Sequence, residues 1–278
     1  MGKLKGYLQL IRPPNCFMMG FAVIVGASLV SSFNYSINLL LGFVTSFSLT
    51  AASMVINDYT DREIDSINEP NRPIPRGDIK PKEALSFAII LCVVGLVAAF
   101  ETNFPRFSVA IIALIISITY ITKGKNTGLP GNFLVSATVV IPFIYGGLTT
   151  GQIETSTLLF VTIVFLSNTG REITKGIVDI EGDKKHNIKT IAVTKGEKIA
   201  AITAATFSLI AVGISPLPWI WGIVTNWFIP LVIITDVGLI VSSIFLIKNP
   251  SRKNAKKIKN LTLIWFITGL FAFILGRV

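Results

Sequence analysis

Residues 37–65 read INLLLGFVTSFSLTAASMVINDYTDREID and join a long apolar run to a dense group of carboxylates. The apolar part has about 20 residues, which is enough to cross a bilayer as a helix. Asp58, Asp61 and Asp65 follow it at i, i+3 and i+7, so a helix that continues through them places three carboxylates on one face. Like charges this close repel one another unless a cation lies among them, and oxygen ligands suit Mg²⁺. The stretch therefore predicts a membrane helix that ends in a metal site.

A second acidic segment repeats this arrangement. Asp179-Ile180-Glu181-Gly182-Asp183 has the Asp-x-Glu-x-Asp spacing of residues 61–65, and it too follows an apolar run. A single cluster of this kind could be the solvated polar end of a helix. Two clusters with matching spacing favour a shared function, and we interpret both as candidate Mg²⁺ sites.

The composition is that of a polytopic membrane protein. The chain has 278 residues, of which 51% are hydrophobic and 14% charged, and its mean hydropathy is +0.69. Nine apolar runs are long enough to span a bilayer, at about 16–33, 37–57, 84–101, 107–122, 130–150, 155–170, 198–218, 226–247 and 260–277. Basic residues precede the first run as in a signal peptide, but no convincing cleavage site follows, so we expect this span to be retained.

The basic residues predict the orientation in the cell membrane. Of the 25 lysine and arginine residues, all but Arg106 and Arg277 lie in the amino-terminal segment or in alternate loops. This asymmetry predicts that the amino terminus and both acidic loops are cytoplasmic, and an odd number of spans then puts the carboxyl terminus outside. The net charge of +10 follows the same pattern between spans, so it does not indicate nucleic-acid binding.

Other site types have little support. The two cysteines define no disulfide framework, and one histidine cannot form a histidine-rich metal site or a convincing Ser/His/Asp triad. No P-loop motif is present. The sequence gives no indication of oligomeric state.

The two acidic segments also indicate a weak internal repeat. They lie four spans apart, and aligning Asp61 with Asp179 brings Pro75-Arg76-Gly77 close to Thr194-Lys195-Gly196. An offset of four helices preserves orientation, so we interpret residues 1–278 as one domain in which spans 1–4 and 5–8 repeat and span 9 is added.

Cations accompany the carboxylates in these loops. Carboxylates beside several basic side chains indicate a ligand that contacts metal and cation together, and a diphosphate has suitable oxygens. The basic residues in question are Arg62, Arg72 and Arg76 in the first loop, Lys123 and Lys125 after Tyr120, and Arg171, Lys175, Lys184 and Lys185 around the second acidic segment.

The order of these motifs resembles the UbiA-type intramembrane prenyltransferases over essentially the whole chain. The resemblance rests on Arg12-Pro13, Asn57-Asp58-x-x-Asp61-x-x-x-Asp65, Asn71-Arg72-Pro73, Arg76-Gly77, Tyr120 with Lys123 or Lys125, and Asp179-x-x-x-Asp183. The spacing after Tyr120 leaves open whether Lys123 or Lys125 matches the family lysine. Residues 171–183 are similar to the archaeal digeranylgeranylglyceryl phosphate synthase branch of that family.

The resemblance implies an all-α membrane protein, a bundle of nine transmembrane helices around a lipid-accessible cavity, capped by the two Asp-rich cytoplasmic loops. It implies Mg²⁺ bound by Asn57, Asp58, Asp61, Asp65, Asp179 and Asp183. The cations implied to bind the donor's diphosphate or the acceptor are Arg72, Arg76, Lys123, Lys125, Arg171, Lys175 and Lys184. Tyr120 would shield an allylic cation. The donor would be geranylgeranyl diphosphate, and the acceptor hydroxyl that of geranylgeranylglyceryl phosphate.

Two alternatives compete with this interpretation. The first is a related prenyltransferase that acts on an aromatic quinone precursor. The residues of the acceptor pocket would be scattered apolar ones, which form no motif that distinguishes the two acceptors. A secondary transporter would also explain a repeat and acids in a membrane protein, but its sites usually lie near the bilayer midplane, where this chain offers Asp236. A membrane alcohol phosphotransferase is disfavoured because its Asp-Gly-x-x-Ala-Arg signature is absent.

Overall fold

The computed structural model describes residues 2–30, 36–148, 153–185 and 187–277, and within these ranges the regular elements are helices. The chain forms two compact units. Unit 1 comprises Met1–Thr122 and Ile141–Ile153, and unit 2 comprises Lys123–Val140 and Glu154–Val278. The weak repeat expected from the sequence stays a prediction.

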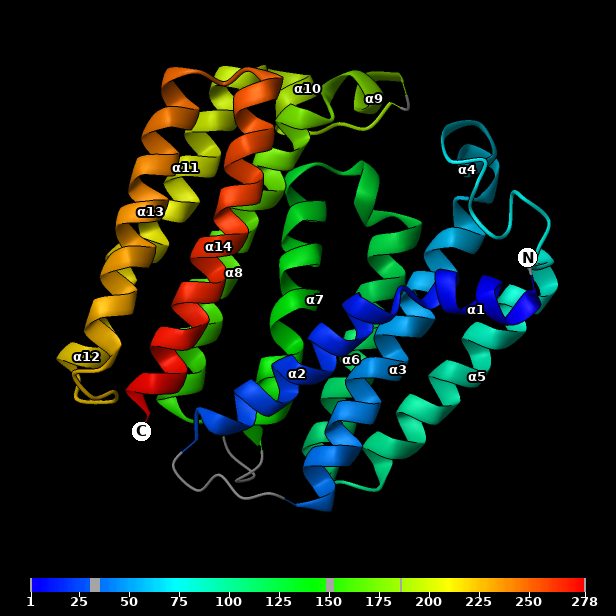
Figure 1. Ribbon diagram of the computed structural model, residues 1–278, viewed down its shortest axis with the longest axis horizontal. Coiled ribbons are helices and arrows are strands. Elements are labelled where there is room, and N and C mark those ends of the chain that lie inside the picture. The colour runs from blue at the N-terminus through cyan, green and yellow to red at the C-terminus, as the bar shows by residue number, and fades with distance from the viewer. Residues whose placement is uncertain (1, 31–35, 149–152, 186, 278) are drawn as a thin grey trace. The chain divides into compact units, whose positions relative to one another are not determined.

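Unit 1 holds the first six α-helices and the end of the seventh (Figure 1). They are α1 (Lys3–Ile11), α2 (Pro13–Ser28), α3 (Ile37–Thr60), α4 (Arg62–Asn68), α5 (Pro81–Phe100), α6 (Phe104–Thr122) and α7 (Leu129–Gly147). Helix α1 was not expected from the sequence. It meets α2 at a bend of 45°, where Arg12 has a φ of 50° and Pro13 opens the next helix.

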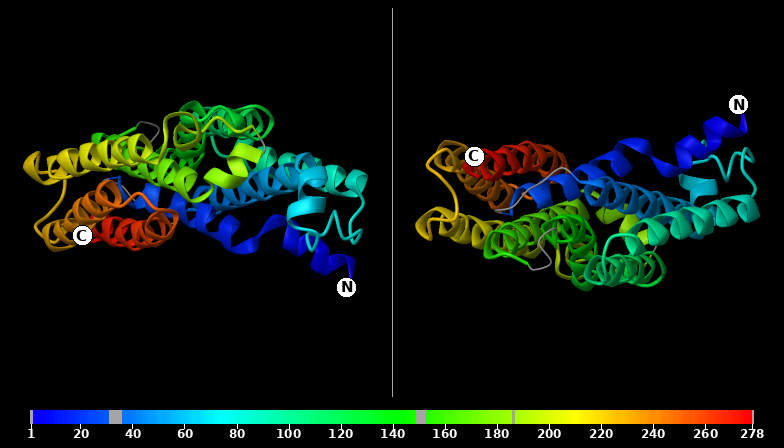
Figure 2. Two further views of the ribbon diagram at one scale, coloured as in Figure 1. Left: turned by 90° about the horizontal axis from the view of Figure 1, so that it is seen from above. Right: turned by 90° about the horizontal axis from the view of Figure 1, so that it is seen from below.

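Unit 2 holds the start of α7 and the remaining helices. These are η1 (Gly124–Asn126), α8 (Thr155–Val178), α9 (Ile180–Lys185), α10 (Ile191–Lys195), α11 (Glu197–Ile214), α12 (Leu217–Ile220), α13 (Phe228–Lys248) and α14 (Arg252–Gly276). Both views of Figure 2 show α13 and α14 running side by side.

The described part of each predicted span coincides with a helix; residues 31–33 and 149–150, at the ends of two predicted spans, lie outside the described residues. Seven helical segments of the described chain are long and apolar enough to cross a membrane. The bent pair α1 and α2 counts as an eighth if it forms one span. Helix α8 has 24 residues but falls outside this set because its second half carries Ser167, Asn168, Arg171 and Glu172. The chain is a multi-pass, all-α membrane protein.

Two polar side chains of α8, Asn168 and Thr169, bond to a neighbouring helix inside unit 2. Ser136 of α7 accepts hydrogen bonds from Asn168 Nδ2 at 3.1 Å and from Thr169 Oγ1 at 2.9 Å. Such bonds join membrane helices, because an unpaired polar group in hydrocarbon is costly. The low hydropathy of α8 therefore reflects contacts with its neighbours.

Asp236 of α13 has a similar explanation. Its Oδ2 accepts a hydrogen bond of 2.6 Å from Ser215 Oγ at the end of α11. A helix-to-helix hydrogen bond accounts for this acid without a transport pathway.

Gly128 of unit 2 lies where a larger residue should destabilise the fold. Its φ is +69°, and a Cβ there would collide with the backbone carbonyl of Lys189. We expect Gly128→Ala to lower the free energy of unfolding by at least about 2 kcal/mol, since it combines a left-handed residue with a backbone clash. Gly213→Ala is the control, because that helical position has open space around its Cα. Equal thermal stability of the two variants in detergent would contradict this packing.

Candidate active site

The first acidic segment lies where α3 gives way to α4. The Asp61 N–H donates to Asn57 O at 2.9 Å and the Asp65 N–H donates to Asp61 O at 2.8 Å, so i→i−4 bonding continues through the junction. The helix axis breaks at Asp61, which has φ −87° and ψ 1°. The predicted continuous helix is therefore wrong in detail, although the hydrogen-bonding pattern is retained.

Two of the three carboxylates meet at one guanidinium. Arg72 Nη1 lies 2.6 Å from Asp65 Oδ2 and 3.3 Å from Asp58 Oδ1. Arg12 Nη2 adds a contact of 2.6 Å to Asp58 Oδ1. Asp58 and Asp65 are 3% and 6% exposed, so both need such partners to stay ionised. The sequence does not predict this role for Arg12, because nothing in the spacing connects it with Asp58.

The donor chemistry of this segment fits Mg²⁺, since Asn57, Asp58, Asp61 and Asp65 all offer oxygen. Among the described residues, however, no three acidic, cysteine or histidine side chains converge as metal ligands. Guanidinium groups contact Asp58 and Asp65 instead. Burial raises the pKa of the Asp65 carboxyl, and the charge of Arg72 opposes that rise.

The loop that carries Arg72 is held by apolar packing. Ile74 and Ile79 lie in a cluster of buried side chains with Leu10 of α1, Val55 of α3 and Ala84 of α5. The side chains of Ile74 and Ile79 are 7% and 0% exposed. This burial fixes the backbone on both sides of the turn and so positions Arg72.

Arg76, predicted to bind substrate, is bonded within unit 1. Its Nε donates to Asp78 Oδ2 at 2.9 Å, its Nη1 to Asn71 O at 2.9 Å, and its Nη2 to Gln9 Oε1 at 3.0 Å. The hydrogen bond from Arg76 holds the pKa of Asp78 below its usual value. These contacts tie the loop to α1, and a substrate-binding role for Arg76 stays a prediction.

The second acidic segment has similar local geometry. Asp179 follows α8 with φ −100° and ψ 8°, and its N–H donates to Lys175 O at 3.0 Å. The Asp183 N–H donates to Asp179 O at 2.9 Å, and Asp183 O accepts from the Ile188 N–H at 2.9 Å. Asp179 is exposed and Asp183 half-buried.

The loop with Lys123 and Lys125 contacts the segment that follows Asp183. The Lys189 N–H donates to Asn126 O at 3.3 Å, next to the close approach at Gly128. Within unit 2 the structure thus connects these lysines with the second acidic segment. Lys123 is exposed and Lys125 half-buried.

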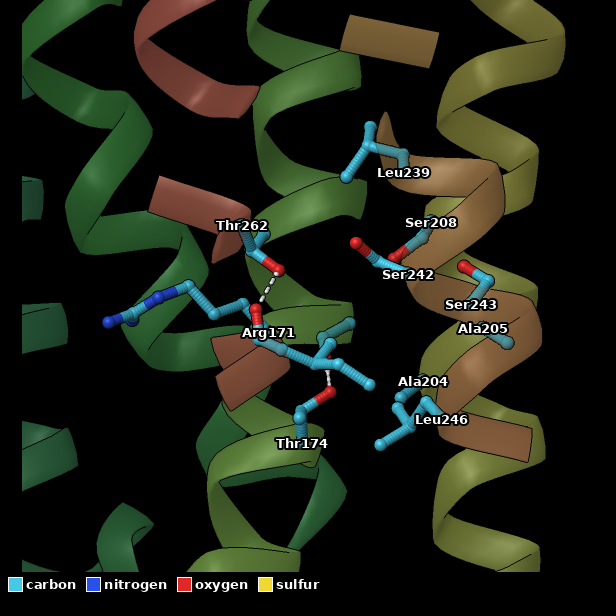
Figure 3. A pocket seen from close by; sticks show the side chains of 12 residues that line it. Arg171, Thr174, Ala204, Ala205, Ser208, Leu239, Ser242, Ser243, Leu246 and Thr262 are labelled. Atoms are coloured by element: carbon cyan, nitrogen blue, oxygen red, sulfur yellow. Dashed lines mark hydrogen bonds between the residues drawn. The ribbon is translucent and has the colours of Figure 1, made fainter. Parts of the chain in front are cut away.

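Arg171 and Lys175, both predicted to bind substrate, share one acid. Arg171 Nη1 lies 3.1 Å from Glu172 Oε1, and Lys175 Nζ lies 3.4 Å from Glu172 Oε2. Figure 3 shows the Arg171 guanidinium directed away from the serines of the small cavity between α8, α11 and α13. The remaining predicted residues are placed as follows: Tyr120 is half-buried in α6, and Lys184 is exposed in α9.

Arg72→Ala tests the carboxylate pairing in unit 1. We expect the free energy of unfolding to fall by about 2 kcal/mol, less than for a fully buried pair, because Arg72 is 31% exposed and Arg12 still contacts Asp58. Adding Asp65→Asn should recover part of the loss, since it removes the unpaired charge. The control is Arg62→Ala, whose partner Glu63 is 86% exposed. Equal losses for Arg72→Ala and Arg62→Ala in detergent unfolding would contradict the pairing.

The chain is similar to known proteins over nearly its whole length. Residues 17–270 match the model of the UbiA prenyltransferase family. A digeranylgeranylglyceryl phosphate synthase of Methanocaldococcus jannaschii is 36% identical, with 100% of this chain and 98% of that protein covered.

Solved structures of the same family share the fold of this chain. One described as giving insights into digeranylgeranylglyceryl phosphate synthase in membranes has a TM-score of 0.89 and 36% identity, with coverage of 100% of this chain and 99% of that one. A UbiA homolog from Archaeoglobus fulgidus bound to GPP and Mg²⁺ shares the fold, with a TM-score of 0.72, 21% identity and coverage of 97% and 99%. The match over nearly the whole chain shows that this protein belongs to the UbiA prenyltransferase family.

Proposed function

We propose that the protein transfers a geranylgeranyl group from geranylgeranyl diphosphate to the free hydroxyl of geranylgeranylglyceryl phosphate. The product is an ether of the kind found in archaeal membrane lipids. Full-length relatives at 31–36% identity are named for this reaction. The observation in the structure that supports it best is the convergence of Asp58, Asp65 and Arg72 at the end of a membrane-length helix.

The site residues fall into two groups: acidic residues and Asn57 that bind Mg²⁺, and basic residues that neutralise the charge of the donor's diphosphate. We assign Asn57, Asp58, Asp61 and Asp65 in one segment, and Asp179 and Asp183 in the other, to Mg²⁺ binding. When bound, Mg²⁺ supplies positive charge to the diphosphate oxygens as the allylic C–O bond breaks. Support comes from the homolog solved with GPP and Mg²⁺. Arg72, Arg76, Lys123 or Lys125, Arg171, Lys175 and Lys184 would neutralise the phosphate charges that remain.

The reaction breaks the allylic C–O bond of the donor and forms an ether C–O bond to the acceptor. The diphosphate leaves with both electrons of the C–O bond, and the acceptor oxygen bonds to the allylic carbon and releases its proton to the departing diphosphate. Tyr120 is assigned to shielding the cationic carbon with its ring. In the metal-free protein Arg12 contacts Asp58, and Arg72 contacts Asp58 and Asp65, so positive charge lies beside both carboxyls.

The finer architecture is also part of the proposal. Nine transmembrane helices would surround a cavity open to lipid, with both acidic segments on its cytoplasmic side. The support is a helix at each predicted span and the one-sided distribution of the basic residues.

Reporter fusions test the orientation. Reporters fused after Lys80 and after Lys189 should both read as cytoplasmic, and one fused near Asn103 should read as external, because the basic residues follow that division. An external reading for either acidic segment would exclude a donor site shared by both.

Substitution of single carboxylates tests the metal assignment. We expect Asp61→Ala and Asp183→Ala each to abolish turnover while the protein still inserts and unfolds at nearly the same temperature. Both side chains are only half-buried, so their loss should cost little stability. Full activity of both variants, or undiminished turnover in excess chelator, would refute the two-segment metal site.

The acceptor phosphate gives a test of substrate class. Hydrogen bonds from Arg or Lys to phosphate contribute roughly 1.5–3 kcal/mol each. The dephosphorylated lipid alcohol should therefore react at least about tenfold less efficiently, since about 1.4 kcal/mol corresponds to a factor of ten. The measurement is kcat/KM for both acceptors on one enzyme preparation. Equal values, or clear turnover of 4-hydroxybenzoate instead, would move the protein to the branch that prenylates aromatic quinone precursors.

A further inference from the structure

The turn between α13 and α14 carries a dense group of cations that the proposed reaction does not use. Residues 248–259 contain six basic side chains and no acidic one. The six, which we call the basic turn, are Lys248, Arg252, Lys253, Lys256, Lys257 and Lys259.

The stability of the helix does not account for these charges. Arg252 and Lys253 open α14, where the helix dipole disfavours cations, and Ser251 makes no side-chain cap there. In the described part of the chain, the basic turn has one ion pair, Arg252 Nη1 to Glu181 Oε2 at 3.5 Å. Its side chains are 63% and 76% exposed, so it contributes little.

Three of the lysines share one face of α14. Lys253, Lys256 and Lys257 stand at i, i+3 and i+4 and are all exposed. Ala255 and Ile258, on the other face, are 0% and 5% exposed and pack into the core of unit 2. The lysine face therefore points away from the protein.

The helix register places these cations beside exposed apolar side chains. Thr235 Oγ1 and Thr268 Oγ1 lie 2.8 Å apart across the antiparallel pair. Lys256 lies twelve residues before Thr268, and Ile247 lies twelve residues after Thr235. Both helices rise about 1.5 Å per residue, so Lys256 lies level with Ile247, which is 37% exposed.

A second contact supports this register. Asn254 Nδ2 donates to Phe245 O at 3.0 Å and to Asn249 O at 2.6 Å, which holds the start of α14 against the end of α13. Within one helical turn of Ile247, Ile244 and Phe245 are 45% and 58% exposed. In a membrane helix such apolar side chains face lipid chains, so the basic turn lies at the boundary between hydrocarbon and headgroups.

We propose that the basic turn binds the phosphate headgroup of an anionic bilayer lipid. Lys253, Lys256 and Lys257 contact the phosphate, and Ile244 and Phe245 contact the first part of the lipid chain. Clusters of four to eight cations beside a membrane helix attract anionic headgroups. The apolar neighbours at the same level favour a lipid over a soluble anion. The proposal does not rest on the prenyl-transfer reaction.

Lipid retention by the purified full chain tests the site without donor or Mg²⁺. The protein in detergent is mixed with phosphatidylglycerol and phosphatidylcholine, and native mass spectrometry measures the ratio of the two lipids retained. The variant K253Q/K256Q/K257Q should retain phosphatidylglycerol at least about threefold less selectively than the unmodified chain. The control K5Q/K80Q/K82Q removes three exposed lysines of unit 1 and should retain it normally.

Two further measurements test whether lipid retention depends on the positive charges of the basic turn. K253R/K256R/K257R should keep the selectivity, because it keeps the charges, and it guards against a glutamine variant that fails to fold. With the unmodified chain, raising NaCl from about 0.1 M to about 1 M should weaken retention, since screening shortens from about 10 Å to about 3 Å. Equal retention by the glutamine variant and the control, or displacement of the lipid by equimolar inorganic phosphate, would overturn the proposal.

Discussion

The site in unit 1 depends on keeping two buried carboxylates charged at the end of a membrane helix. Asp58 and Asp65 have almost no contact with solvent, and ionised groups in such places need cations nearby. Arg72 contacts both and Arg12 contacts Asp58. Two features of the fold position these arginines: Ile74 and Ile79 anchor the loop that carries Arg72, and the 45° bend between α1 and α2 falls at Arg12.

The same physics operates in unit 2 with other partners. Glu172 lies between Arg171 and Lys175, Ser136 pairs with Asn168 and Thr169, and Ser215 pairs with Asp236. These polar groups within membrane-length helices each have a neighbour that satisfies them, whereas Thr157 Oγ1 of α8 and Arg106 Nε of α6 are buried without a hydrogen-bond partner among the described residues. Sequence hydropathy alone sees these residues as interruptions, which is why α8 is too polar to count as a span although it is long enough.

How far the sequence could predict the molecule depends on the range of the interactions. Apolar runs report residence in the hydrocarbon of the bilayer, a local property, so the described part of each predicted span coincides with a helix. The pairing of Asp58 with Arg12, 46 residues away, has no local signal, and neither does the contact between Arg76 and Gln9, 67 residues apart. The amphipathic helix α1 was missed because Lys3 and Lys5 made its sequence read as a polar flank. The break at Asp61 was missed because helix periodicity does not report where an axis bends.

The central proposal is that the acidic segments hold metal for the donor's diphosphate. The most direct measurement is anomalous scattering from crystals of the protein grown with Mn²⁺ and a non-reactive thio analogue of the donor. The account predicts a Mn²⁺ peak within coordination distance of Asp61 and one within that distance of Asp183, each with a diphosphate oxygen bound. No Mn²⁺ at either carboxylate, or Mn²⁺ there without diphosphate, would contradict it.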